Sequence, residues 1–184
     1  VVRNLLYKYT QLQTTFGVIN LCLIDGVPQV VSMKNMITNF IEFRHDVVLR
    51  RTLFELKNAE DRMHILEGLR IALENLDEVI ATIRASQTPP EANEQLQIKF
   101  GLSEIQAKAI LDMRLQRLTG LERDKILQEL KEVLARIAEL QGILASEAKV
   151  MDIIVSELEG VRAQFGDERR TEIIDAGFEP QEEE

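Results

Sequence analysis

The feature that most constrains this chain is a helical repeat of apolar residues that continues from Ser32 to Ser86 with no proline. Apolar side chains recur every three or four residues, which places them on one face of an α-helix. A second stripe of the same period fills residues 121–166. Because the segment between them is short, the two stripes predict a long antiparallel two-helix coiled-coil arm.

The composition agrees with a mainly α fold. Hydrophobic residues make up 45% of the 184 positions, aromatic residues only 5%, and Trp is absent, which argues against a β-sandwich or barrel. No apolar run approaches the roughly 20 residues of a membrane span. Cys22 is the single cysteine and cannot form an internal disulfide, so nothing points to secretion. The start at Val1-Val2 leads us to expect a piece of a larger protein.

The N-terminal segment predicts a helix end followed by a β-hairpin. Residues 5–13 are short and polar-aromatic, as at the end of a helix, and residues 14–31 contain two β-rich runs around Asp25-Gly26, a hairpin turn signal. A lone two-stranded hairpin is marginally stable in water. We therefore expect it to pack on something outside this chain.

Three helix-start signals fall between the two long helices. Thr88 precedes two prolines and a glutamate, Ser103 precedes Glu104 and Gln106, and Thr119 precedes Glu122. Each is the pattern of a capping box or N-cap. Three starts in about thirty residues predict a small globular helical tip, with one helix from Ser103 to about Leu118.

Both long helices contain a stretch where the apolar register fails. Residues 57–62 are polar and Gly68 follows them, which predicts a bend or break in the outgoing helix; the returning helix slips at Ala145-Ser146 and ends at Gly166 in the manner of a C′ glycine. We expect the two stretches to face each other as a hinge, because lost seam contacts make bending easier. The hinge residues are Lys57, Arg62, Ala145 and Ser146.

The predicted organisation has five parts. Residues 1–31 form the end of a tower-like segment with the hairpin, residues 32–63 the outgoing coiled-coil helix and residues 64–120 the dimerisation tip. Residues 121–166 form the returning helix. Residues 167–184 combine a short strand at 171–174 with an acidic linker.

The tip has more apolar surface than the arm can cover. A second copy of the chain would cover it by an isologous contact, so we predict a homodimer through the tip. The predicted interface residues lie on the outgoing helix and on the helix after Ser103. They are Leu66, Leu69, Leu73, Ile110, Leu111, Met113, Arg114 and Leu118.

The charge distribution excludes an electrostatic DNA clamp. The formal net charge is −9, of which residues 167–184 carry −6, so the rest of the chain carries only −3. Five arginines still cluster near the predicted root of the arm. They could form a solvated face, contact phosphate or make an ion-pair lock between the arm and the body. These residues are Arg44, Arg50, Arg51, Arg169 and Arg170.

The sequence contains no pattern for catalysis by this chain alone. His45 and His64 are the only histidines, and on one helix they would lie roughly 28 Å apart, which excludes a shared metal. His45-Asp46 suggests a metal-dependent phosphohydrolase only weakly, because other ligands are missing. No glycine-rich phosphate loop or nucleophile motif is present. We therefore predict no metal and no catalytic residue.

Several ordered motifs resemble the A subunits of bacterial type IIA topoisomerases. DNA gyrase is the best match and topoisomerase IV is the competitor. Together the motifs cover nearly the whole chain, which makes chance agreement implausible. They are residues 12–17, DGVP at 25–28, VVLRRTLFEL at 47–56, HILEGL at 64–69, QAKAILDMRL at 106–115, LTGLE at 118–122 and FGDERRTEI at 165–173.

The resemblance implies a coiled-coil arm with an exit-gate dimerisation region. In that family the catalytic tyrosine lies N-terminal of this region, and Tyr7 and Tyr9 do not match its motif. The resemblance also implies that ATP and Mg²⁺ act through the B subunit, that double-stranded DNA passes through the enclosed cavity, and that the protein is cytoplasmic, at the bacterial nucleoid. The alternatives are a generic homodimeric coiled-coil scaffold and, more remotely, a hydrolase using His45-Asp46.

Overall fold

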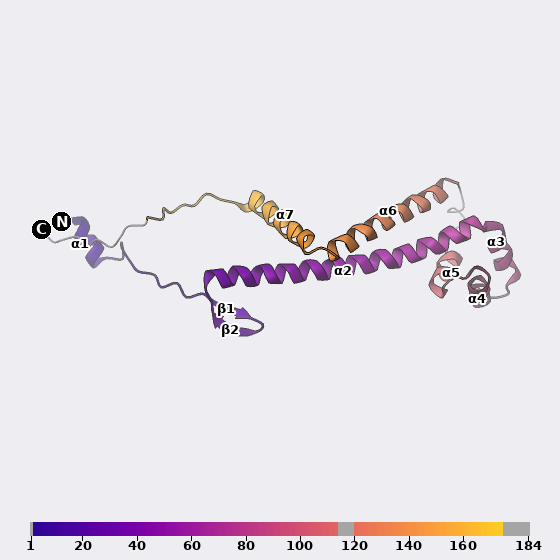
Figure 1. The fold of residues 1–184 in the computed structure, drawn as a ribbon, viewed down its shortest axis with the longest axis horizontal. Coiled ribbons are helices and arrows are strands. Elements are labelled where there is room, and N and C mark those ends of the chain that lie inside the picture. The colour runs from indigo at the N-terminus through magenta and orange to yellow at the C-terminus, as the bar shows by residue number, and fades with distance from the viewer. Residues whose placement is uncertain (1, 114–119, 175–184) are drawn as a thin grey trace.

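The two apolar stripes form long helices that lie side by side and run in opposite directions (Figure 1). The computed structural model describes residues 2–113 and 120–174. The fold is mainly α with a two-stranded hairpin near the N-terminus, as predicted. In chain order the elements are α1 (Val2–Tyr9), β1 (Leu21–Ile24), β2 (Val27–Val30), α2 (Met33–Glu74), α3 (Leu76–Ala85), α4 (Pro89–Phe100), α5 (Glu104–Leu111), α6 (Gly120–Leu144) and α7 (Glu147–Phe165).

Helix α2 forms the spine of the arm. Its 42 residues correspond to about 63 Å at 1.5 Å per residue. The Ser32 side chain accepts a hydrogen bond from the Asn35 backbone N–H at 3.2 Å, which caps the first turn. The predicted break at residues 57–62 is absent, because this stretch is polar but contains no proline or glycine to interrupt the helix. The helix ends instead at Asn75, where α3 begins after one residue.

Two ion pairs fix the alignment of α2 with α6. Arg62 donates two hydrogen bonds to the Glu129 carboxylate, at 2.7 and 2.8 Å, and Arg136 lies 2.6 Å from Glu55. The buried apolar residues of α6, among them Ile137, lie on the face that packs against α2. The polar stretch of α2 is therefore tied to its partner helix by charged contacts.

The predicted break in the returning helix is confirmed. Helix α6 ends at Leu144, and the Ser146 side chain caps α7 by accepting from the Lys149 backbone N–H. Its predicted position opposite residues 57–62 is wrong, because Arg136 already lies at Glu55 and Val150 packs with Val48. The break therefore lies opposite residues 48–55 of α2.

The return path through this break contains surplus residues. On α2, seven positions separate Val48 from Glu55, whereas fourteen positions separate Arg136 from Val150 on the other side of the arm. Two helices in continuous contact would use equal numbers of residues, since both rise 1.5 Å per residue. About seven residues are therefore absorbed where α6 ends and α7 begins. Figure 1 shows the resulting change of direction.

Helices α3, α4 and α5 form the tip around the last turns of α2 (Figure 1). Thr88 caps α4, and Gly101 ends it with a φ of 64°, a left-handed conformation that glycine adopts without strain. Ser103 forms the predicted capping box with Gln106 at the start of α5. Helix α5 ends at Leu111. The helix predicted to run to about Leu118 is therefore shorter than expected, since Asp112 and Met113 are described and are not helical. Residues 114–119, which include the predicted Thr119 cap, lie outside the described residues.

The predicted hairpin is confirmed, whereas two features of the C-terminal segment differ from prediction. Asp25 and Gly26 have φ values of 50° and 78°, the positive pair of a type I′ turn, and Leu21 pairs with Val30 across the strands. Residues 171–174 are not a strand. The Gly166 N–H donates to the Arg162 carbonyl oxygen at the end of α7, but the φ of Gly166, −72°, is not the left-handed conformation of a C′ glycine. Of the acidic linker, residues 175–184 lie outside the described residues.

Candidate dimerisation site

The tip is built on a core that α2 shares with α3, α4, α5 and α6. Leu66 and Leu96 are 0% exposed, and Ile110 is 3% exposed. Because these side chains are excluded from solvent and closely packed, they hold the short helices in fixed positions at the end of the arm. Its buried members are Leu66, Leu69, Ala72, Leu73, Val79, Leu96, Leu102, Ala107, Ile110, Ile126 and Leu130.

This core corrects half of the predicted interface. Leu66, Leu69, Leu73 and Ile110 are buried within one chain, so they support the tip and do not face a partner. The prediction was wrong because it counted only α2 and the helix after Ser103, while α3, α4 and α6 also cover these side chains. Leu111 and Met113 are half-buried at the edge of the core. Arg114 and Leu118 lie outside the described residues.

A side-chain network joins α5 to α2. The His64 Nε2 lies 2.7 Å from the Ser103 Oγ, and the Gln106 side-chain amide donates to the His64 carbonyl oxygen at 2.7 Å. Gln106 also closes the capping box by accepting from the Ser103 N–H at 2.9 Å. Gln106 is only 7% exposed, so these bonds satisfy a buried amide. The network fixes the start of α5 against the spine.

Gly68 of α2 lies in close contact with Gln106 of α5. A Cβ atom at this position would lie 2.7 Å from the Cβ and Cγ atoms of Gln106. Only glycine therefore fits where α2 meets α5. An isolated glycine inside a strong helical pattern often marks such a contact, so this position could have been identified from the sequence.

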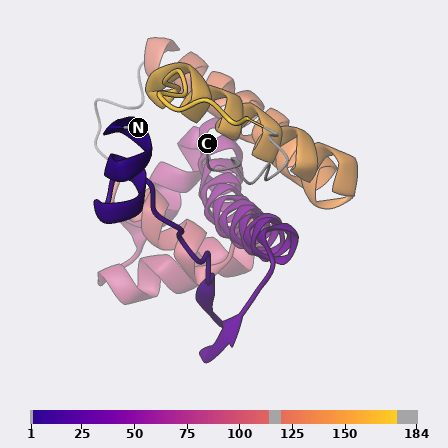
Figure 2. The same ribbon diagram turned by 90° about the vertical axis from the view of Figure 1, so that its left-hand side faces the viewer.

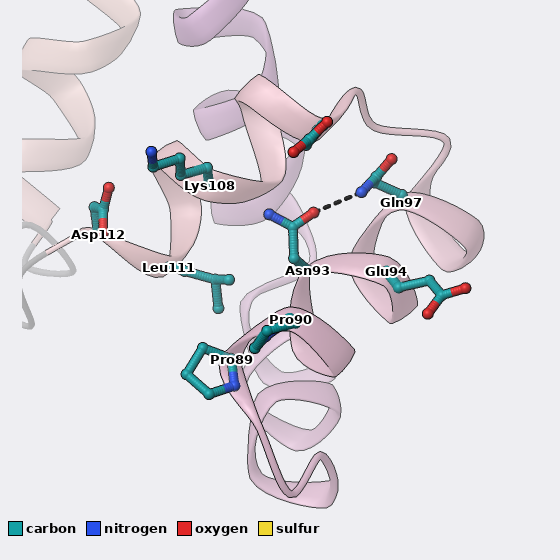
Figure 3. Close-up of a pocket in the computed structure, with 9 residues that line it drawn as sticks. Pro89, Pro90, Asn93, Glu94, Gln97, Lys108, Leu111 and Asp112 are labelled. Carbon is teal, nitrogen blue, oxygen red and sulfur yellow. Dashed lines mark hydrogen bonds between the residues drawn. The ribbon is translucent and has the colours of Figure 1, made fainter.

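An open groove of about 470 Å³ runs between α4 and α5 (Figure 3). Pro89, Pro90 and Asn93 line it from α4, and Lys108 and Leu111 line it from α5. Three acidic residues, Glu94, Glu104 and Asp112, line the same groove as Lys108. The groove thus combines apolar side chains with charges of both signs, a pattern that can complement a copy of itself.

Two arginines at the other end of the arm pair with a glutamate of the returning helix, so these ion pairs lie within the arm. The lock between arm and body stays a prediction. Arg51 lies 2.7 Å from Glu157 of α7, and Arg44 pairs with the same carboxylate. The Arg51 hydrogen bond, aided by Arg44, holds the pKa of Glu157 below its ordinary value, while partial burial opposes this shift. Glu157 was not predicted, although it follows the buried Ile154 by three residues on the same stripe.

The remaining basic residues have local partners or lie in solvent. Arg50 pairs with Asp46 one turn earlier on α2, at 2.7 Å. Arg169 donates to the Thr171 carbonyl oxygen at 3.0 Å. Arg170 is exposed. Contact between this cluster and DNA stays a prediction, as does bending at the four hinge residues.

The histidines do not take part in a metal cluster in the part of the chain that the structure describes. His45 and His64 both lie on α2, as expected, and within residues 2–113 and 120–174 no three His, Cys, Asp or Glu side chains could together hold a metal ion. Cys22 is half-buried with a free thiol. Among the helices of these ranges, none is both long and apolar enough to cross a membrane.

Comparison with known proteins gives the family. The sequence profile of the DNA gyrase/topoisomerase IV A subunit matches residues 1–159. The chain belongs to this family. It is 53% identical over all 184 residues to the DNA gyrase A subunit of Staphylococcus aureus strain MRSA252, with the same identity to that of strain NCTC 8325 / PS 47. The gyrase A subunit of strain Mu50 / ATCC 700699 is 52% identical over the same length.

These alignments cover only part of each related protein. The alignments cover 100% of this chain but 21% of each S. aureus protein. The chain therefore spans about a fifth of the length of the gyrase A subunits it matches. The arm, the tip and the hairpin are the structure of this chain over that length.

Proposed function

We propose that the chain is the exit-gate dimerisation arm of a DNA gyrase A subunit. The observation that carries this proposal is the position of the tip. A well-packed helical unit stands at the end of a spine about 63 Å long, with an open groove on its surface. A long arm whose tip dimerises can contact the second copy far from the rest of the subunit, and the two arms then enclose a space between them.

In this proposal the two tips form a protein gate. They close a cavity below the DNA gate, separate to release the transported duplex, and join again. During the cycle they also keep the broken DNA complex together. The ion pairs along α2 and α6 support a gate that moves as a unit, because they fix one helix against the other over the outer half of the arm.

The intact protein would be a type II DNA topoisomerase, an isomerase that changes DNA topology by ATP-dependent strand passage. ATP and Mg²⁺ would act through the B subunit, and double-stranded DNA would pass through the cavity. This chain lacks a match to the tyrosine motif of the family, so we expect it to be catalytically silent alone. The proposal places the assembled enzyme in the bacterial cytoplasm, at the nucleoid.

The proposed interface is the outer surface of α4 and α5. Leu111 and Met113 supply apolar area at the edge of the core, and Lys108 shares the groove with acidic groups. Around a two-fold axis, Lys108 of one protomer can approach Glu104 or Asp112 of its partner. Each buried leucine or methionine side chain contributes roughly 1.5–3 kcal/mol, so two copies suffice for a contact that still opens.

The second candidate is the same region of a topoisomerase IV A subunit, which the family match includes. A generic homodimeric coiled-coil scaffold is the third. A scaffold needs no strand passage, so an activity measurement separates it from the two topoisomerase functions.

The deciding experiment uses a complete A subunit carrying this chain, reconstituted with its B subunit. Leu111→Glu is expected to lower ATP-dependent change of plasmid linking number by about tenfold or more, because a tenfold loss corresponds to about 1.4 kcal/mol and burying an unpaired carboxylate costs more than that. DNA cleavage is expected to persist. Unchanged strand passage would remove the gate proposal.

Two further variants make this result specific. Leu134→Glu introduces the same chemical change on an exposed arm position and is expected to leave strand passage intact. Lys108→Glu changes an exposed groove residue without touching the core, so it tests the interface even if Leu111→Glu disturbs the tip. Equal loss from Leu134→Glu would place the interface along the arm.

A further inference from the structure

Beyond the Glu157 ion pairs, the two helices of the arm separate while their apolar stripes continue. Figures 1 and 2 both show the C-terminal end of α7 lying away from α2. On α2, Ile37 and Phe40 are 53% and 47% exposed, and on α7, Val161 and Phe165 are 54% and 69% exposed. The apolar side chains of each stripe are thus buried near Val48 and exposed to solvent further along the helix.

These exposed residues lie on the same helix faces as the buried ones. At about 100° per residue, Ile37 and Phe40 fall within about 40° of Arg44 around α2. Val161 and Phe165 fall within about 60° of the buried Val150 on α7. The exposed stripes are therefore extensions of the seam that Val48, Val150 and Ile154 already form.

The Arg44–Glu157 pair fixes which residues would meet if the seam continued. One turn before Arg44 lies Phe40, and one turn after Glu157 lies Val161. Two turns away in each direction lie Ile37 and Phe165. In antiparallel helices these pairs come opposite each other, since both helices advance by the same rise per residue.

We infer that the last two turns of α7 are a strap that closes onto the N-terminal half of α2, in the register set by Glu157. Phe40 then packs against Val161 and Ile37 against Phe165. The root of the arm consequently has an open form, which the structure presents, and a zipped form. The inference goes beyond the proposed gate and would hold for any function of the arm.

The break between α6 and α7 provides the pivot for this closure. Residues 145 and 146 are outside both helices, and about seven surplus residues lie in the return path around them. Helix α7 can therefore change its angle to α2 while α6 stays fixed by its own ion pairs. Glu157 stays bound between Arg44 and Arg51, which lie about one turn before and one turn after Val48, so the turns of α7 after Glu157 are those that approach α2.

Disulfide trapping in the full 184-residue chain tests the strap. Cys22 is first changed to serine, and then Phe40→Cys and Val161→Cys are combined. A disulfide requires the two Cα atoms to come within about 7 Å, and the zipped form places Phe40 opposite Val161. The matched control combines Thr38→Cys and Glu159→Cys, each two residues earlier and so on the opposite side of its helix.

The zipped form predicts that the Phe40→Cys/Val161→Cys pair oxidises about tenfold faster than the control pair, the ratio given by a preference of about 1.4 kcal/mol. Adding Glu157→Gln is expected to slow the first pair several-fold and leave the control unchanged. Circular dichroism verifies that each variant is helical. Equal oxidation rates for the two pairs, or no effect of Glu157→Gln, would overturn the inference.

Discussion

Replacing Gly68 with alanine is expected to loosen the tip by separating α5 from α2. The new Cβ would lie 2.7 Å from the Cβ and Cγ atoms of Gln106. Both are at the base of that side chain, so a rotamer change cannot remove the clash. Helix α5 must move away from the spine, and the Gln106 hydrogen bond to the His64 carbonyl oxygen, 2.7 Å long, is stretched or lost.

The expected magnitude follows from three opposing effects. Overpacking a close contact costs about 1–3 kcal/mol. Loss of the hydrogen bond costs about 1 kcal/mol more. Alanine inside a helix is more stable than glycine by about 0.5–1 kcal/mol, which opposes these losses. The free energy of unfolding should therefore fall by about 1–3.5 kcal/mol, which for a chain of this length lowers Tm by about 2–14 °C.

Gly160→Ala is the matched control. Gly160 lies inside α7, and a Cβ there would meet nothing within 4 Å, so only the helix-propensity gain remains. Its Tm should rise by about 1–4 °C. Thermal unfolding at one fixed protein concentration measures both variants, and amide exchange of residues 104–111 locates the change. A Gly68→Ala variant with raised Tm and unchanged exchange in α5 would refute the close-packing argument.

Three other outcomes follow from the described contacts. The folded-state pKa of Glu157 is below its unfolded value, so the stability that its ion pairs contribute is present at neutral pH and is lost as pH falls below about 4.5. In Glu157→Gln, the amide exchange of α7 should lose this dependence on acid. Leu66→Ala should destabilise the tip by about 2–5 kcal/mol in chemical denaturation, whereas Leu53→Ala, at an exposed position, should change stability by about 0.5 kcal/mol or less. Ser103→Ala should cost about 0.5–2 kcal/mol, with faster amide exchange at Gln106.

The parts of the fold that were predictable depend on neighbouring residues. Asp25-Gly26 specifies a turn, Ser103 specifies a helix start, and Ala145-Ser146 interrupts a heptad pattern. Each signal acts within about one helical turn or one hairpin, so no knowledge of distant contacts is needed. For the same reason the α2 stripe identified a long helix before its partner was known.

The wrong predictions concern contacts between distant residues. The polar stretch at residues 57–62 stays helical partly because Arg62 meets Glu129, which is far away in sequence. Leu66, Leu69 and Leu73 were placed in an interface because the cover supplied by three other helices could not be counted from one stripe. Glu157 and the surplus residues near it become visible only when the register between the helices is known.

The most direct measurement is sedimentation equilibrium of the chain and of its Leu111→Glu variant over a range of micromolar concentrations. If the tips bind one another, the unmodified chain should reach twice its mass of 21.0 kDa, while Leu111→Glu should stay at 21.0 kDa and remain helical by circular dichroism. A helical Leu111→Glu chain that is still dimeric at these concentrations would contradict dimerisation through the tip.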